Sequence, residues 1–158
     1  MCAFPFNKTI NVLVFILANV IIDIEPLLVM SFNLAYPLHG YAHTFLGAII
    51  IGGLFGYLSF KSKKILNIIM KLLKLPFEFS MKQYICSGVF GAVLHLLFDA
   101  PLYTDIKPFY PLLNNPLYGL VFSSFMYGIC LLLFILAIIL YVYVIIKNKN
   151  SDSSLKIR

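Results

Sequence analysis

Four long apolar stretches limit what this chain can fold into. They lie near residues 9–31, 41–60, 81–99 and 117–146, and each is close to the roughly 20 apolar residues that a helix needs to cross a membrane. Charged residues make up only 11% of the sequence, against about 25% in a soluble domain. We therefore expect an all-α integral membrane protein, a bundle of four transmembrane helices that forms a single domain over residues 1–158.

Two of these stretches contain residues that shape helices. Pro26 lacks a backbone N–H and clashes with the preceding turn, so the sequence predicts a break or kink there in the first stretch. In the second stretch, small residues recur at every fourth position, as Ala48, Gly52 and Gly56. Such rows let helices in lipid approach closely and gain van der Waals contact. We therefore expect the second helix to pack tightly against a neighbour.

Residues 61–79 have a different character, because lysines are mixed there with apolar residues at helical spacing. This pattern predicts a basic amphipathic helix lying on the membrane surface, on the cytoplasmic side by the positive-inside rule. Four spans then place both termini in the cytoplasm, and every Lys and Arg except Lys107 falls on that side. We expect a multi-pass protein of the cell membrane. No basic patch interleaved with exposed aromatics indicates a nucleic-acid partner.

The histidines and acids are concentrated in a few short segments. His39 and His43 are four residues apart, as are His95 and Asp99, and this spacing puts both members of a pair on one face of a helix. The predicted topology brings all three histidines of the chain and most of its acids toward the outer end of the bundle. The acids at this end are Asp23, Glu25, Asp99 and Asp105.

Ionisable groups at this depth indicate a functional site, since a charge inside a membrane costs several kcal/mol unless it is paired. Imidazoles with carboxylates suit Zn²⁺ or another first-row metal. The candidates outnumber the ligands of one closed tetrahedral site, so two metals, or one metal with supporting carboxylates, both remain open. Haem is disfavoured by the neighbouring carboxylates. A proton or ion conduit would need polar residues that continue to the cytoplasmic end.

Three segments of the chain resemble a known family. Asp23 to Glu25, His39 to Thr44 and His95 to Asp99 are similar to the P-D-x-D, H-R-G-x-T-H-S and S-H-L-L-L-D segments of the YdjM-like family of membrane-bound, predicted metal-dependent hydrolases. The resemblance covers about residues 5–120. Glu25 stands where the family has Asp, and the second segment is one residue shorter between its histidines. The resemblance implies a hydrolase of phosphoester type.

These observations give each candidate residue an expected role. A metal, most simply Zn²⁺, would be held by residues among Asp23, His39, His43, His95 and Asp99. Glu25 or Asp105 is expected to act as general base, and Lys107 to bind a phosphate at the membrane surface. A site at the outer face favours a lipid or lipid-linked substrate. The alternative is a non-enzymatic metal-binding or scaffold membrane protein.

Overall fold

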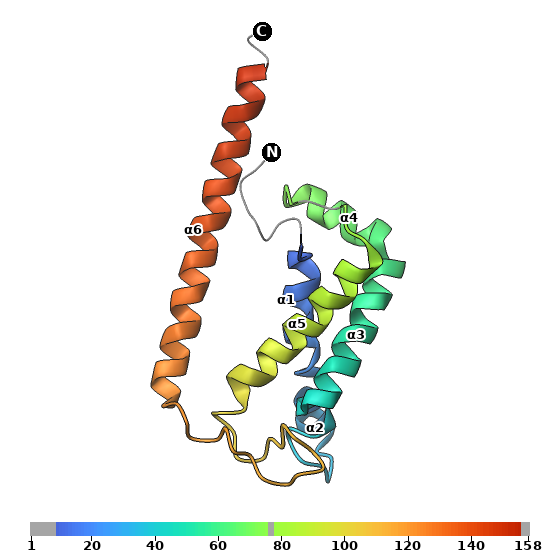
Figure 1. Ribbon diagram of the computed structural model, residues 1–158, viewed down its shortest axis with the longest axis vertical. Helices are drawn as coiled ribbons and strands as arrows, with labels where there is room; N and C mark the ends of the chain where they lie inside the picture. Colours follow the sequence, from blue (N-terminus) through green and yellow to red (C-terminus); the bar gives the residue numbers. More distant parts are fainter. Residues whose placement is uncertain (1–8, 76–77, 156–158) are drawn as a thin grey trace.

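The computed structural model describes residues 9–75 and 78–155, and over these residues the chain is helical with no strand (Figure 1). Most of the described residues lie in six α-helices, and one short 3₁₀ helix precedes α3. The elements are α1 (Val12–Ile21), α2 (Ile24–Phe32), η2 (Tyr41–His43), α3 (Phe45–Lys61), α4 (Lys63–Leu72), α5 (Met81–Asp99) and α6 (Ser123–Leu155).

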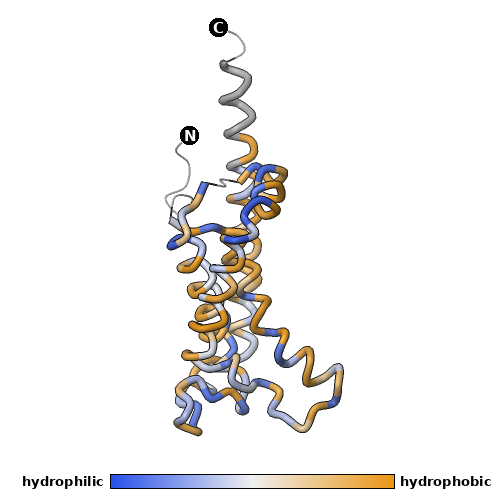
Figure 2. Tube along the Cα trace, turned by 90° about the vertical axis from the view of Figure 1, so that its right-hand side faces the viewer, coloured by the Kyte–Doolittle hydropathy of each residue, from blue (hydrophilic) through white to orange (hydrophobic). Residues whose placement is uncertain are grey.

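Three stretches of the described chain are long and apolar enough to cross a membrane on their own: Val12–Phe32, Met81–Asp99 and Ser123–Tyr143. The helices α3 and α4 qualify only together, as a pair bent by 84°. The number of candidate spans is therefore three, or four if the bent pair is one span. Figure 2 shows apolar segments along the helices and hydrophilic segments toward the two ends. The prediction of an all-helical chain with membrane-length helices is confirmed at this level.

The first span is interrupted before Pro26 rather than at it. Helix α1 ends at Ile21 and α2 begins at Ile24, with Asp23 at the N-cap of α2. Pro26 lies in the first turn of α2, where a missing N–H removes no intrahelical hydrogen bond. The predicted break at Pro26 is thus displaced by less than one turn. As a consequence, Asp23 lies at the junction of two helices.

The second span begins later than predicted, at Phe45 instead of residue 41. Thr44 caps α3, because its Oγ1 accepts a hydrogen bond from the Gly47 N–H at 2.9 Å. The three residues before this cap form η2, a single 3₁₀ turn. His39 and His43 are therefore not on one α-helix, and the expectation that they share a helix face is wrong.

Small residues bring α3 and α5 into close contact, as the sequence predicted. A Cβ atom added to Gly52 would lie 2.5 Å from the Gly88 carbonyl oxygen, and one added to Gly56 would lie 2.5 Å from the carbonyl oxygen of Tyr84. Larger side chains at these positions would push the two backbones apart. The contact fixes α5 against α3, and His95 follows Gly88 two turns further along α5.

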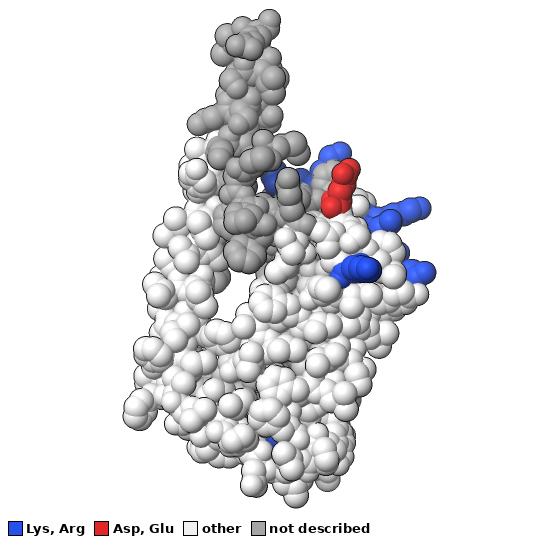
Figure 3. All heavy atoms as spheres, viewed as in Figure 1, with Lys and Arg blue, Asp and Glu red and all other residues white. Residues whose placement is uncertain are grey.

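The lysine-rich segment forms α4, which lies across one end of the helical body (Figure 1). On the face shown in Figure 3, lysine side chains gather at this end of the molecule. Helix α4 exposes Ile65, Ile68 and Leu72, in keeping with the predicted amphipathic helix. It ends at Leu72, short of the predicted residue 79. A proline such as Pro76 is expected to end a helix, but Pro76 lies outside the described residues.

The last helix begins at Ser123 rather than at residue 117, and its side chains are largely exposed. Before it, residues 100–122 form a loop that folds over the end of the bundle opposite α4 (Figure 1). The Phe45 N–H donates to the Pro108 carbonyl oxygen at 2.8 Å, and the rings of Phe45 and Phe109 lie 5.1 Å apart. These contacts attach the loop to the start of α3, next to the histidines.

Candidate metal centre

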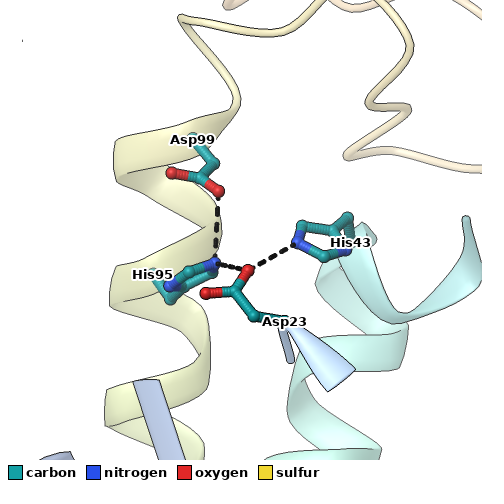
Figure 4. A group of neighbouring side chains, drawn as sticks. All are labelled: Asp23, His43, His95 and Asp99. Carbon is teal, nitrogen blue, oxygen red and sulfur yellow. Dashed lines mark ion pairs between the residues drawn. The ribbon is translucent and has the colours of Figure 1, made fainter. Parts of the chain in front are cut away.

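Four of the predicted metal ligands converge at the end of the bundle that the loop covers. Asp23, His43, His95 and Asp99 each offer one ligand atom, and these atoms all lie within 4.8 Å of one another. The side chains come from the junction of α1 and α2, from η2 and from the last two turns of α5 (Figure 4). Residues that are far apart in the sequence thus form one compact group of two imidazoles and two carboxylates.

Asp23 lies between the two imidazoles (Figure 4). Its Oδ1 atom is 3.1 Å from His95 Nε2 and 3.8 Å from His43 Nε2. The Oδ2 atom of Asp99 is 3.2 Å from His95 Nε2. Atoms that share one tetrahedral metal ion, with bonds of about 2.0–2.2 Å, lie roughly 3–4 Å apart. The spacing of these atoms is therefore on the scale of a single metal site.

The two imidazole nitrogens that face the group lack hydrogen bonds. The Nε2 atoms of His43 and His95 are buried without a hydrogen-bond partner among the described residues. Nearby carboxylate oxygens are within ion-pair distance of both atoms, but not in hydrogen-bond geometry. A buried polar atom left without a partner costs about 1–3 kcal/mol. A divalent ion would satisfy both nitrogens, so the donor set fits a metal.

The exposure of the group is uneven. The side chain of His43 is fully buried and that of His95 is 15% exposed, whereas that of Asp23 is 51% exposed. The group is thus closed around its imidazoles and open on the side of Asp23. Catalytic metal sites differ from structural ones in keeping one position accessible, and this opening provides such access.

Glu25 lies behind His43 and outside the group of four. Its Oε2 atom is 3.2 Å from His43 Nδ1, the ring nitrogen that faces away from the group. The same carboxylate accepts backbone hydrogen bonds from Gly40 at 2.9 Å and Ala42 at 3.2 Å. The Tyr36 hydroxyl donates to Oε1 at 3.2 Å. Glu25 therefore contacts His43 from behind and connects it to the loop that precedes η2.

His39 also lies outside the group of four, although its ring is only 4.7 Å from that of His43. Asp105 holds it, because Asp105 Oδ2 is 3.0 Å from both the ring Nδ1 and the backbone N of His39. Burial raises the pKa of the Asp105 carboxyl, but the hydrogen bonds from His39 outweigh this effect and lower the pKa overall. His39 and Asp105 thus form a separate pair beside the group.

A small cavity lies on the loop side of this pair. It has a volume of about 120 Å³, and its walls include His39, Asp105 and Lys107. Lys107 is half-buried and lines this cavity. The structure therefore places Lys107 close to His39 and Asp105, but not within the four-residue group.

Some residues that shape the site were not singled out from the sequence. Tyr36 and Gly40 hold Glu25, and their contacts depend on the path of the loop between α2 and η2. No local sequence pattern predicts such contacts. Thr44 carried a signal, since a Thr directly before an apolar run is typical of a helix N-cap. Reading Thr44 as a cap would have placed His43 before the helix.

Comparison with known proteins adds no relative. No protein-family model, curated protein or solved structure matched the chain. The resemblance to the YdjM-like family accordingly stays a prediction from three short segments. Conclusions about function rest on the geometry of the site and on the chemistry of its residues.

Proposed function

We propose that this protein is a membrane-embedded, metal-dependent hydrolase that acts on a phosphoester of a lipid or lipid-linked substrate at the outer face of the cell membrane. The observation that carries this proposal is the convergence of Asp23, His43, His95 and Asp99 within 4.8 Å. Two buried imidazole nitrogens in this group lack hydrogen bonds. The carboxylate oxygens of Asp23 and Asp99 lie 3.1–3.8 Å from these nitrogens, which is the spacing of atoms that share one ion.

Zn²⁺ is the first candidate for the ion, because it accepts mixed imidazole and carboxylate ligands at the distances that this group can provide. When bound, such an ion would polarise a phosphoryl oxygen and lower the pKa of water at the site. The chain supplies the rest of the arrangement: His43 and His95 are held in a buried position, and the exposed Asp23 side leaves room for substrate.

The position of the group supports the proposed class of substrate. The lysines of α4 lie at the opposite end of the helical body (Figures 1 and 3), and the positive-inside rule assigns that end to the cytoplasm. The group then falls at the outer face, near the ends of apolar helices. A substrate that reaches this level from the membrane is amphiphilic, with its polar group at the interface. Lys107 in the neighbouring cavity provides a cation for phosphate.

Two acids were expected as general base, and their surroundings differ. Asp105 is 38% exposed and lies beside the cavity, so its carboxylate is accessible there. Burial raises its pKa, but the hydrogen bonds from His39 lower the pKa overall, which keeps the carboxylate ionised and weakens it as a base. The carboxylate of Glu25 already accepts four hydrogen bonds. We keep Asp105 as the general base of this proposal.

The test is a hydrolysis screen with purified, Zn²⁺-loaded protein in detergent. Phospholipids and polyprenyl phosphates would be offered to the wild type, to His95→Ala and to Lys64→Ala, a control at the α4 end. The proposal predicts phosphate-ester cleavage by the wild type and the control, with activity abolished by chelator and by His95→Ala. Metal binding without any turnover across the panel would instead favour the non-enzymatic metal-binding protein.

A further inference from the structure

We propose that Glu25 is a positioning residue, which fixes the ring of His43 so that its Nε2 lone pair faces the group of Asp23, His95 and Asp99. This inference rests on the proposed metal site, but it concerns a different atom of His43 and a contact that exists without metal. It replaces the expectation that Glu25 acts as general base.

The chemistry of the contact determines which nitrogen of His43 carries the proton. An ionised carboxylate can only accept hydrogen bonds, and Glu25 Oε2 lies 3.2 Å from His43 Nδ1. The ring must therefore donate from Nδ1, which leaves Nε2 unprotonated in the neutral imidazole. Nε2 is the atom that faces Asp23 (Figure 4). Contacts of this kind orient metal-binding histidines and raise their basicity.

The remaining hydrogen bonds of Glu25 keep its carboxylate in place. Oε2 also accepts the Gly40 N–H, and Oε1 accepts the Ala42 N–H and the Tyr36 hydroxyl. The side chain is only 17% exposed, so water competes weakly for these sites. Each oxygen faces two donors, and the carboxylate has no spare position directed toward a substrate.

The substitution Glu25→Gln tests these hydrogen bonds specifically, because it hardly changes the shape of the side chain. A glutamine amide replaces one oxygen with an NH₂ group, which is a donor. Whichever oxygen is replaced, the NH₂ group would face two existing donors. The substitution should therefore displace the side chain or the loop around Gly40, and release the ring of His43.

Two readouts test the inference. The first is ¹⁵N NMR of the imidazoles in the metal-free protein, with the His43 signals assigned from their loss in His43→Asn. At a pH where the ring carries a single proton, the wild type is expected to show that proton on Nδ1 of His43, the atom that contacts Glu25. The second is the affinity for Zn²⁺, measured by competition with a chelating dye. Glu25→Gln should weaken binding about 10–100-fold, and Glu78→Gln, a control near the start of α5, should leave it unchanged.

The outcomes separate this inference from its rivals. A general base would give Glu25→Gln a lowered kcat with unchanged Zn²⁺ affinity, and that result would overturn the positioning role. A singly protonated His43 ring with its proton on Nε2 in the metal-free wild type would overturn it as well. If the wild type bound no Zn²⁺, the proposed function would fail, while the NMR measurement would still decide the role of Glu25. If Glu25→Gln did not fold, Tyr36→Phe would remove a single donor and should weaken Zn²⁺ binding to a smaller extent.

Discussion

Asp23 owes its position to an interruption of the first span rather than to a helix face. Between Ile21 and Ile24 the backbone stays right-handed, but its hydrogen bonds change to i−3 spacing, as in the bond from the Asp23 N–H to the Val20 carbonyl oxygen. At this junction the carboxylate of Asp23 lies between His43 and His95 (Figure 4). In an uninterrupted α-helix, the direction of this side chain would be set by helical periodicity alone. At the scale of single residues, the site is built from helix ends and a 3₁₀ turn, where the direction of a side chain is set by local backbone geometry.

Among single residues, Lys107 is expected to bind the phosphate of the substrate. Lys107→Ala should raise KM for a phosphoester substrate about tenfold, equivalent to ~1.4 kcal/mol, and leave kcat nearly unchanged. The reason is that Lys107 lines the cavity beside His39 and Asp105, and its positive charge would contribute to phosphate binding in the ground state and the transition state alike. Steady-state kinetics beside Lys64→Ala would check it. A fall in kcat at constant KM would remove Lys107 from the binding role.

At the scale of elements, the contact between α3 and α5 decides whether the ligands meet. Helix α5 carries His95 and Asp99, and α3 follows directly after His43. The glycines of the contact let the backbones approach so closely that a Cβ at Gly52 would lie 2.5 Å from the Gly88 carbonyl oxygen and 2.9 Å from the Ala92 Cβ. The geometry of the candidate metal centre therefore depends on packing that is remote from it.

Gly52→Ala should accordingly destabilise the protein by about 1–3 kcal/mol, the usual cost of overpacking. The matched control is Gly53→Ala on the same helix, where the added Cβ would meet only Val89 Cγ2 at an ordinary 3.6 Å. Denaturant unfolding in detergent micelles would measure the difference. Equal stabilities for the two variants would contradict the close approach of α3 and α5.

The sequence was informative where local signals define an element. Helix α5 has the predicted bounds, because Ser80 and Gln83 form a capping box at its start and Pro101 follows its end. The predicted start of α3 was too early, because apolar periodicity does not distinguish a 3₁₀ turn such as η2 from the first turn of an α-helix. The His39 pairing was misjudged for a related reason: Asp105 lies far along the chain, and no spacing rule predicts such a contact.

At the scale of the whole molecule, the two ends of the helical body differ in chemistry. One end carries the lysines of α4, and the other carries the four-residue group, the His39 and Asp105 pair and the loop over residues 100–122 (Figures 1 and 3). Apolar helices of membrane-spanning length lie between these ends, an arrangement that fits the proposed membrane protein with its chemistry on one side.

Cysteine labelling tests this orientation. In a background without the native cysteines, Ala35→Cys lies in an exposed segment at the end that carries the group, and Lys64→Cys lies on α4. A membrane-impermeant thiol reagent added to intact cells should label position 35 and leave position 64 unmodified until the membrane is permeabilised. Labelling of position 64 alone in intact cells would place the group on the cytoplasmic side and exclude an outer-face substrate.

The most direct test of the account is the metal content of purified protein, measured for the wild type, His95→Ala and His39→Ala after loading with Zn²⁺ and removal of excess metal. His95 belongs to the group of four and His39 does not, although the rings of both lie close to that of His43. We expect the wild type and His39→Ala to retain Zn²⁺, and His95→Ala to lose most of it. Loss of metal in His39→Ala with retention in His95→Ala, or a wild type that retains none, would contradict the proposed metal centre.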